Sequence, residues 1–456
     1  MNKMIKLSAK SLIITLLTSI SLSANAYNFK VNGIYYSITS SSKLEIEVTY
    51  ETSSYNSYSG EVSIPKYVTY NNIIYTVTGI HSHAFQDCTD LTSVTIPGSV
   101  TSIGQYAFYQ CSGLESINFP SSLTSIGKLA FWNCSGLTSI TIPSSITDWG
   151  DGAFYCCTGL TNVTLSEGLA TIGDGAFNGC TGLTSITIPS SVTSIGEYAF
   201  RGTELTNINI PSSVTSIGYG AFYGCTGLTS INIPNSVTSI EDKTFYGCSS
   251  LTNIDIPNSV TSIGYRAFNA CTSLTSLTIP SSVTSIALCA FSGCTGLTSI
   301  TIPSSLTDWG REVFFGCTGL TSVTLSEGLT SIGDEAFRNC TSLTNISVPS
   351  SVTSIGSGAF YNCTGLTSVT LPDGLTSIGS KAFIGCTNLT SINIPNSITS
   401  ISASTFYGCS SLTSIDIPSS VTSIGGCAFW YCTGLTSIDI PTSVTSIDTD
   451  AFYNCI

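Results

Sequence analysis

Residues 85–107 read FQDCTDLTSVTIPGSVTSIGQYA, and this 23-residue pattern returns along most of the 456-residue chain. Phe85 is followed by sixteen more phenylalanines at steps of 23 residues, with one step of 22. Counted from each phenylalanine as position 0, cysteine stands at +3, leucine at +6, isoleucine or valine at +9, valine or leucine at +15, isoleucine at +18 and alanine at +22. Apolar residues at fixed positions of a repeat this long indicate a solenoid, whose units bury their apolar faces against their neighbours.

Each repeat predicts one β-strand. Leu91–Ile96 alternates with a period of two, so Val94 and Ile96 should point inward and Thr95 outward. Pro97 should end the strand, because proline cannot extend the ladder of a central strand. Stacked repeats then form a parallel sheet on one wall, with strands about 4.8 Å apart. The alanine–phenylalanine step should fill the core from an opposite, outer wall, through short turns or 3₁₀/helical pieces.

The chain divides into three predicted segments. Residues 1–26 predict a signal peptide, because three lysines precede a short apolar stretch, Leu12–Leu22, and small residues end at Ala26. The alternative is a buried N-terminal helix. Residues 27–80 are rich in tyrosine and β-branched residues and predict a β-rich N-terminal cap with a degenerate first repeat. Residues 81–456 hold about seventeen 23-residue units of the solenoid.

The charge of the chain excludes two classes of partner. Without residues 1–26, ten basic and 26 acidic residues give a net charge of about −16. Nucleic acid binding needs clustered lysine and arginine, so we expect no nucleic acid partner. Anionic membrane surfaces are disfavoured for the same reason. The apolar stretch of the signal segment is too short to span a bilayer comfortably. The sequence has no second long apolar segment, so we expect no membrane insertion after cleavage.

The repeat resembles a known family. The pattern Leu-x-x-Ile-x-Ile-Pro-x-Ser-Val-x-x-Ile-Gly-x-x-Ala-Phe-x-x-Cys, over roughly residues 62–456, is similar to the BspA-like, Treponema pallidum-type class of leucine-rich repeats. The resemblance implies a leucine-rich repeat array in a bacterial protein that is secreted or held at the cell surface. It also implies adhesion to a host or bacterial surface protein or glycan, and it brings no catalytic residues.

The outward strand position +10 is the candidate binding surface. A second column of mostly serine or asparagine lies two residues earlier, as at Ser93. We expect this polar face to recognise a protein or glycan through many weak contacts; the alternative is a solvated face whose threonines favour the β conformation. The +10 residues are Thr95, Asn118, Thr141, Thr164, Thr187, Asn209, Asn232, Asp255, Thr278, Thr301, Thr324, Ser347, Thr370, Asn393, Asp416 and Asp439.

A third column follows the phenylalanine and is mostly aromatic. Its rings either pack over the joints between repeats of the outer wall or offer faces for sugars and protein partners. Trp149 and Trp309 replace an inward isoleucine at +18 and are expected in the core. The aromatic residues at +1 are Tyr109, Trp132, Tyr155, Tyr223, Tyr246, Phe315, Tyr361, Tyr407, Trp430 and Tyr453.

Sixteen of the 19 cysteines share position +3. Exported proteins often form disulfides. Parallel side chains of stacked units, however, hold their Cβ atoms too far apart for good disulfide geometry. We therefore expect a buried column of free thiols, interrupted by a deletion near Thr203. Free thiols are also expected at Cys156, Cys289 and Cys427, which lie off this position.

No constellation predicts catalysis. His81 and His83 are the only histidines, and a pair without further ligands is a weak metal site. The chain has no nucleophile elbow, phosphate loop or zinc-protease helix motif, and its carboxylates are scattered. We expect no enzymatic activity, no cofactor and no metal.

The sequence thus predicts an exported, non-enzymatic binding or adhesion scaffold. One alternative is a passive cell-surface spacer, which would have no saturable ligand. A second is a protein that binds ice or a polysaccharide surface through its rows of threonine. Interruptions of those rows by Asn, Asp and Ser disfavour ice binding.

Overall fold

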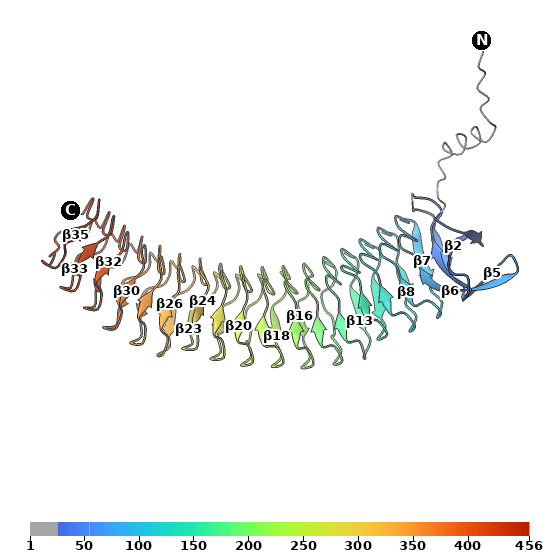
Figure 1. The fold of residues 1–456 in the computed structure, drawn as a ribbon, viewed down its shortest axis with the longest axis horizontal. Coiled ribbons are helices and arrows are strands. Elements are labelled where there is room, and N and C mark those ends of the chain that lie inside the picture. Colours follow the sequence, from blue (N-terminus) through green and yellow to red (C-terminus); the bar gives the residue numbers. More distant parts are fainter. Residues whose placement is uncertain (1–25, 54, 456) are drawn as a thin grey trace, which may run out of the picture.

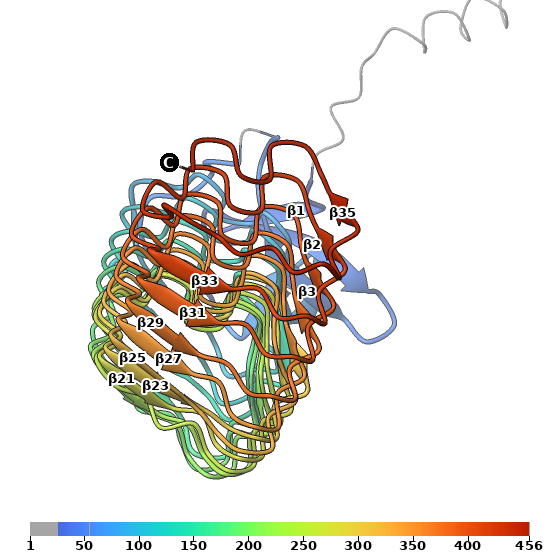
Figure 2. The ribbon, with the colours of Figure 1, turned by 90° about the vertical axis from the view of Figure 1, so that its left-hand side faces the viewer.

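The computed structural model describes residues 26–53 and 55–455, so the predicted signal peptide, apart from Ala26, lies outside the described residues. The chain winds into an arc of stacked coils with a β-rich cap at its N-terminal end (Figure 1). Each coil has four sides (Figure 2). We call them the strand wall (+6 to +11), the proline edge (+12 to +15), the second ladder (+17 and +18) and the turn wall (−4 to +3).

The cap joins an antiparallel meander to the solenoid. β1, β2 and β3 pair antiparallel in sequence, β6 adds to β3 in parallel, and β5 pairs antiparallel with β6. β6 then continues into the second ladder, where Ile80 pairs with Ile103. The ring of Tyr58 lies 4.6 Å from that of Phe85, so the cap covers the core of the first coil. The bounds are β1 (Phe29–Val31), β2 (Ile34–Ser40), β3 (Glu45–Thr49), β5 (Tyr67–Tyr70) and β6 (Ile73–Ile80).

The strand wall is parallel and in register, as predicted. In β11 and β13, for example, Thr141 pairs with Thr164. Where a coil lacks a full strand, single bridges at Thr187 and Asp255 continue the wall. The strands are β4 (Gly60–Ser63), β7 (Leu91–Thr95), β9 (Ser116–Asn118), β11 (Ser139–Ile142), β13 (Asn162–Leu165), β16 (Asn207–Asn209), β18 (Ser230–Asn232), β21 (Ser276–Thr278), β23 (Ser299–Ile302), β25 (Ser322–Leu325), β27 (Asn345–Ser347), β29 (Ser368–Thr370), β31 (Ser391–Asn393) and β33 (Ser414–Asp416).

The second ladder was not predicted. Its strands are two residues long and pair in parallel, so Ser125 and Ile126 lie beside Ser102 and Ile103. The isoleucine faces the core and the serine faces solvent. The strands are β8 (Ser102–Ile103), β10 (Ser125–Ile126), β12 (Asp148–Trp149), β14 (Thr171–Ile172), β15 (Ser194–Ile195), β17 (Ser216–Ile217), β19 (Ser239–Ile240), β20 (Ser262–Ile263), β22 (Ser285–Ile286), β24 (Asp308–Trp309), β26 (Ser331–Ile332), β28 (Ser354–Ile355), β30 (Ser377–Ile378), β32 (Ser400–Ile401), β34 (Ser423–Ile424) and β35 (Ser446–Ile447).

The turn wall consists of successive turns, and no helix occurs among residues 26–53 and 55–455. Of the alternatives predicted for this wall, the turns are therefore confirmed. Backbone N–H groups at −2, 0 and +2 donate to carbonyls of the next coil. The distances are 3.0 Å from Tyr106 N to Lys128 O, 2.7 Å from Phe108 N to Ala130 O and 2.8 Å from Gln110 N to Trp132 O.

The arc curves toward the turn wall. A Cβ added to Gly127, at the start of the turn wall, would lie 2.4 Å from the backbone nitrogen of Gln105 in the preceding coil. A Cβ added to Gly98, on the proline edge, would meet nothing within 4 Å. The two positions differ because Gly127 packs against the preceding coil and Gly98 is exposed to solvent. Figures 1 and 2 show that the turn wall lies on the concave side of the arc. Our prediction of an outer position for this wall is wrong.

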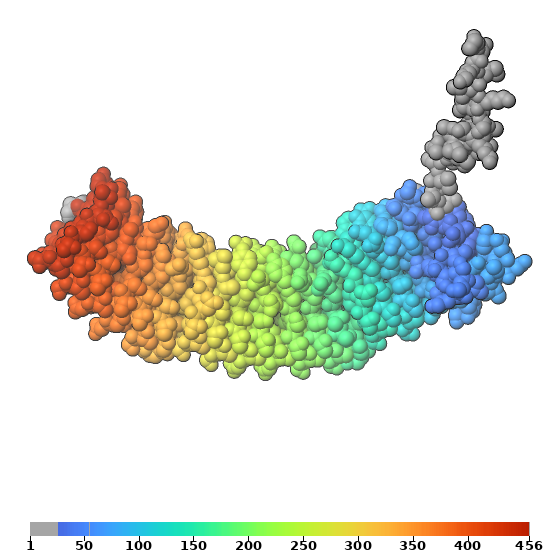
Figure 3. All heavy atoms as spheres, in the orientation of Figure 1, coloured from blue at the N-terminus to red at the C-terminus, as the bar shows by residue number. Residues whose placement is uncertain are grey.

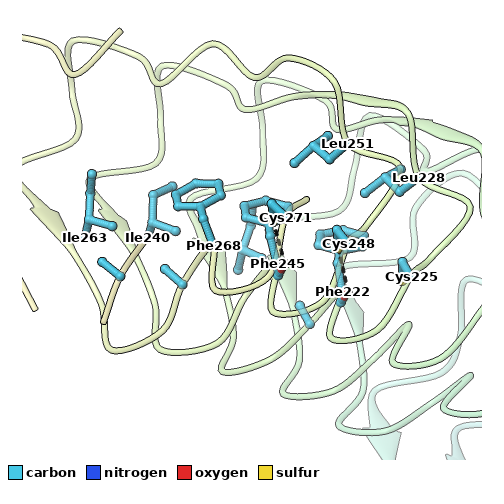
Figure 4. Close-up of a cluster of buried hydrophobic side chains, with 14 of the residues drawn as sticks. Phe222, Cys225, Leu228, Ile240, Phe245, Cys248, Leu251, Ile263, Phe268 and Cys271 are labelled. Carbon is cyan, nitrogen blue, oxygen red and sulfur yellow. Dashed lines mark hydrogen bonds between the residues drawn. The ribbon is translucent and has the colours of Figure 1, made fainter. Parts of the chain in front are cut away.

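The core is a continuous stack of rings and aliphatic side chains. Phe245 is fully buried, and its ring lies 5.6 Å from Phe222 and 5.2 Å from Phe268 (Figure 4). Each phased thiol after Cys88 donates to the phenylalanine carbonyl of the preceding coil, as from Cys248 Sγ to Phe222 O at 3.2 Å. Burial of a side chain of this size contributes about 1.5–3 kcal/mol to the stability of the fold, so the repeated stack is the main source of cohesion.

The cysteine column consists of free thiols, as predicted. Burial raises the pKa of Cys225, Cys294 and Cys363 to about 12. The expectation that a deletion interrupts the cysteine column near Thr203 is wrong in detail, because Thr203 itself occupies position +3 of its coil. It is fully buried and donates to Phe200 O of its own coil at 2.8 Å, whereas the thiols donate to the preceding coil. The deleted residue follows Thr203, since leucine comes two positions later at Leu205.

Candidate functional site

The strand wall exposes all sixteen predicted +10 residues. The neighbouring residues at +9 and +11 are buried in most coils, as Ile140 and Ile142 are on either side of Thr141. This alternation follows from the pleat of a β-strand, which turns successive side chains to opposite faces. The sixteen side chains therefore form one column along the outside of the strand wall, and it is bordered by the exposed serine and asparagine side chains at +8.

This column differs from other hydroxyl columns in its free hydrogen-bonding capacity. Thr161 at +7 donates to Thr138 O at 3.2 Å, Ser122 at +14 to Val100 O at 2.7 Å and Thr124 at +16 to Thr101 O at 3.0 Å. Those columns connect one coil to the next. Within residues 26–53 and 55–455, no +10 side chain donates or accepts a hydrogen bond or forms an ion pair. The +10 groups remain available to a partner.

The predicted aromatic column at +1 lies on the turn wall. Its rings stack on one another across the coils, at 4.4 Å between Tyr109 and Trp132 and 4.6 Å between Tyr223 and Tyr246. Nine of the ten side chains are half-buried and Tyr453 is exposed. These rings therefore pack over the coil joints and still present one edge or face to solvent.

The sequence analysis missed that tyrosine, lysine and arginine are concentrated on the turn wall. Beyond residue 80, all twelve tyrosines lie between positions −3 and +2. The seven lysines and arginines of this region also lie there: Lys128, Arg201, Lys243, Arg266, Arg311, Arg338 and Lys381. Counting the position of every cation in the repeat would have revealed this bias. The concave side therefore carries the cations of the solenoid, whereas its acidic residues are found on all sides.

One group of these cations is neutralised within the chain. The guanidinium groups of Arg311 and Arg338 both pair with Glu335, and the Arg338 Nη1–Glu335 Oε2 distance is 2.6 Å. Burial opposes ionisation of Glu335, but the hydrogen bonds from Arg338 and Arg311 lower its pKa. Glu312 completes the cluster at 3.7 Å from Arg338. This arrangement connects neighbouring coils and leaves little charge for a ligand.

The two histidines, which the sequence analysis considered as a weak metal site, contact other residues of the chain. His83 contacts Gln86 through Nδ1 and stacks between Tyr55 and Tyr106, while His81 Nδ1 contacts Ser82 O at 2.9 Å. Among the described residues, no group of three His, Cys, Asp or Glu side chains is placed to hold a metal. No helix in the same part of the chain is long and apolar enough to cross a membrane.

The other predicted positions are structural. The off-phase Cys156, Cys289 and Cys427 are free thiols on the turn wall. Trp149 and Trp309 are half-buried against the core, as expected, and their Nε1 atoms are buried without a hydrogen-bond partner.

Comparison with known proteins gives a consistent result. The family model described as BspA type leucine rich repeat region (6 copies) matches residues 78–204, 193–321, 264–373 and 330–456. A leucine-rich repeat protein from Bacteroides ovatus ATCC 8483 is 33% identical, over 91% of this chain and 95% of its own, with a TM-score of 0.66. No curated protein matches the chain.

Two further solved structures are similar over most of their length. A leucine rich cell surface protein from Faecalibacterium prausnitzii A2-165 is 31% identical, over 79% of this chain and 93% of its own, with a TM-score of 0.49. The pneumococcal vaccine antigen PcpA is 20% identical, over 87% of this chain and 92% of its own, with a TM-score of 0.52, and shares the fold. These relatives are repeat proteins rather than enzymes, and a surface protein is among them.

Proposed function

The chain belongs to the BspA-type leucine-rich repeat family, and from this premise we propose that it is an exported, non-enzymatic binding scaffold of the bacterial surface. Its partner is a host or bacterial surface protein or glycan, held by the strand wall. The +10 column supplies the contacts. Adhesion through this column needs neither a cofactor nor a metal.

The observation that carries this proposal is the unused hydrogen-bonding capacity of the +10 column. Neighbouring threonine and serine columns bond to the adjacent coil, as Thr161 and Ser122 do, so their hydroxyls serve the fold. The exposed hydroxyl, amide and carboxylate groups at +10 have no such role. Many weak polar contacts along a rigid array add up, because a rigid surface loses little conformational entropy on binding.

The experiment is a binding screen followed by matched variants. The purified exported chain is applied to an array of glycans and matrix proteins, and any ligand is titrated. The variant Thr141→Lys/Thr187→Lys/Thr301→Lys adds three long charged side chains to the column. All three positions are exposed, so we expect the fold to persist and the affinity to fall by roughly tenfold or more, by the cost of leaving polar contacts unmade.

A control variant places the same charges on the proline edge. Ser121, Ser281 and Ser419 are exposed at +13, and their replacement by lysine should leave the affinity unchanged. Equal losses in the two variants would contradict the strand-wall assignment. The absence of any saturable ligand would favour the passive spacer, and thermal hysteresis in a freezing assay would favour ice binding.

A further inference from the structure

A patch in the middle of the turn wall combines cations with tyrosine rings. The guanidinium carbon of Arg201 lies 5.3 Å from the ring centre of Tyr198 and 5.0 Å from that of Tyr223. Two coils further along, Lys243 Nζ lies 5.2 Å from the ring centre of Tyr219 and 5.6 Å from that of Tyr265. The guanidinium carbon of Arg266 lies 5.1 Å from the ring centre of Tyr265. We define the basic tyrosine patch as Tyr198, Arg201, Tyr219, Tyr223, Lys243, Tyr265 and Arg266.

The cations of the patch have no acidic partner. Within the described residues, none of Arg201, Lys243 and Arg266 forms an ion pair, in contrast to the cluster around Glu335. The nearest carboxylates in sequence to Lys243 are engaged elsewhere. Asp242 accepts from the Tyr265 N–H at 2.6 Å, and Glu241 accepts from the Ser239 hydroxyl at 2.5 Å. Glu197, Glu241 and Asp242 lie on the same wall, but in the described part of the chain none of them pairs with these three cations, which therefore remain available to an anion.

Lys243 is held in place by its aromatic neighbours. A side-chain hydrogen bond from Lys243 lowers the pKa of Tyr219, and the same bond raises the pKa of Lys243. A cation over an aromatic face gains about 0.5–1 kcal/mol at exposed sites. The rings thus orient the ammonium group without neutralising its charge.

The backbone at these positions favours glycine. Position −2 has a positive φ, and Gly175 and Gly220 occupy it at 59° and 56°. In the patch the same position holds Tyr198, Lys243 and Arg266, at 53°, 56° and 53°. A side chain in the left-handed region costs roughly 1–2 kcal/mol. Most other coils also hold a side chain at −2, as at Leu129, Glu312 and Ser404, so a glycine variant at this position should relieve strain in any coil.

We propose that the basic tyrosine patch binds an anionic polysaccharide lying along the concave edge. The cations pair with its carboxylate or sulfate groups, and the half-exposed tyrosine rings contact its sugar faces and hydroxyls. The coils repeat at a spacing comparable with the length of one hexose in an extended chain. Figure 3 shows the concave edge as an open, continuous surface.

A folded protein partner fits this surface less well. Protein interfaces are enriched in tyrosine and arginine, but their cores are depleted of lysine and carboxylate side chains, and Lys243 lies within the patch beside Asp242. Of the large apolar side chains exposed in the described residues, none lies within the patch. The site is separate from the strand wall, so this proposal does not depend on the proposed function.

The test uses glycine variants, because they remove a cation without straining the backbone. Lys243→Gly and Arg266→Gly should keep or raise the melting temperature. Each should weaken binding of polygalacturonate or dextran sulfate by roughly tenfold, the value of one charge-assisted hydrogen bond. Titration of the purified exported chain with both polymers distinguishes carboxylate from sulfate recognition, and neutral dextran should not bind.

Lys381→Gly is the matched control. Lys381 also stands at −2 with a positive φ of 63°, but it lies outside the patch, so its variant should bind as the unaltered chain does. The proposal is overturned if Lys381→Gly loses as much affinity as Lys243→Gly, or if poly-glutamate binds better than both polysaccharides. It is also overturned if the patch variants lower the melting temperature and leave binding unchanged, because the cations would then serve only to join coils. The strand-wall variant Thr141→Lys/Thr187→Lys/Thr301→Lys should retain polysaccharide binding, which separates this site from the first.

Discussion

Replacement of Phe245 by alanine tests the origin of the solenoid's stability. The ring is fully buried between the rings of Phe222 and Phe268. Its removal leaves a cavity and breaks two stacking contacts, and a Phe→Ala change of this kind costs about 3–5 kcal/mol. The carbonyl of residue 245 remains to accept the bond from Cys271, so the loss comes from packing alone.

The loss of stability caused by Phe245→Ala should be confined to the neighbouring coils. A coil touches only its neighbours, and the stability of such an array is approximately a sum of unit terms and nearest-neighbour terms. Hydrogen exchange measured peptide by peptide should therefore show faster opening of the coils around Phe222, Phe245 and Phe268. A change of about 4 kcal/mol corresponds to a roughly thousandfold rise in the opening constant. Coils near the cap should exchange as in the unaltered chain.

Phe452→Ala is the matched control. This ring is half-buried and stacks on Phe429 alone, at 5.3 Å, so we expect less than half the cost. Equal costs at the two sites, or an equal rise in exchange along the whole arc, would refute the reasoning, because either result would mean that coils do not stabilise one another by pairwise packing.

Three further predictions follow from single contacts. Gly127→Ala should cost about 1–3 kcal/mol in urea unfolding, since its Cβ would strike the preceding backbone, whereas Gly98→Ala should cost almost nothing. Trp149→Phe should stabilise the fold by about 1 kcal/mol by removing a buried N–H without a partner, and an unchanged unfolding midpoint would contradict this. Raising the pH above 9 should destabilise the fold, because thiols of the unfolded chain ionise near pH 9, whereas the buried Cys225 and Cys294 ionise only near pH 12. Each such thiol lowers the free energy of unfolding by up to about 1.4 kcal/mol per pH unit. An unfolding midpoint that stays constant from pH 8 to 11 would contradict this prediction.

The sequence was sufficient to predict the core and the strand wall. Positions such as Val94 and Ile96 repeat with a period of two inside a period of 23, and this double periodicity leaves one arrangement that buries every apolar side chain. The exposure of Thr95 and its counterparts follows from the same alternation. The buried thiols followed from the direction of side chains in stacked units.

Other features depend on distances between coils that no single repeat encodes. A two-residue strand such as Ser102–Ile103 is too short to show any periodicity, so the second ladder could not be predicted. The direction of curvature depends on small differences in coil spacing between the walls, and the residue pattern of the repeat does not state them. The basic tyrosine patch was missed because Arg201, Lys243 and Arg266 are far apart in sequence and become neighbours only when the coils stack.

The strand wall and the basic tyrosine patch can differ in chemistry because the exposed side chains of both surfaces contribute little to the stability of the fold. Coils are joined by backbone hydrogen bonds on the strand wall, the second ladder and the turn wall, and by buried side chains, so exposed positions vary without loss of the stack. If the exposed cations served only to keep the surface solvated, they would be spread over all four sides of the coils. Instead the seven cations beyond residue 80 lie on the concave side, where the arc brings side chains of neighbouring coils closest together. The cations of the basic tyrosine patch, which form no ion pair in the described residues, would attract an extended anion there. The strand wall instead offers mostly neutral polar contacts, with three aspartates at +10. A single array of coils can thereby hold two unlike partners at once.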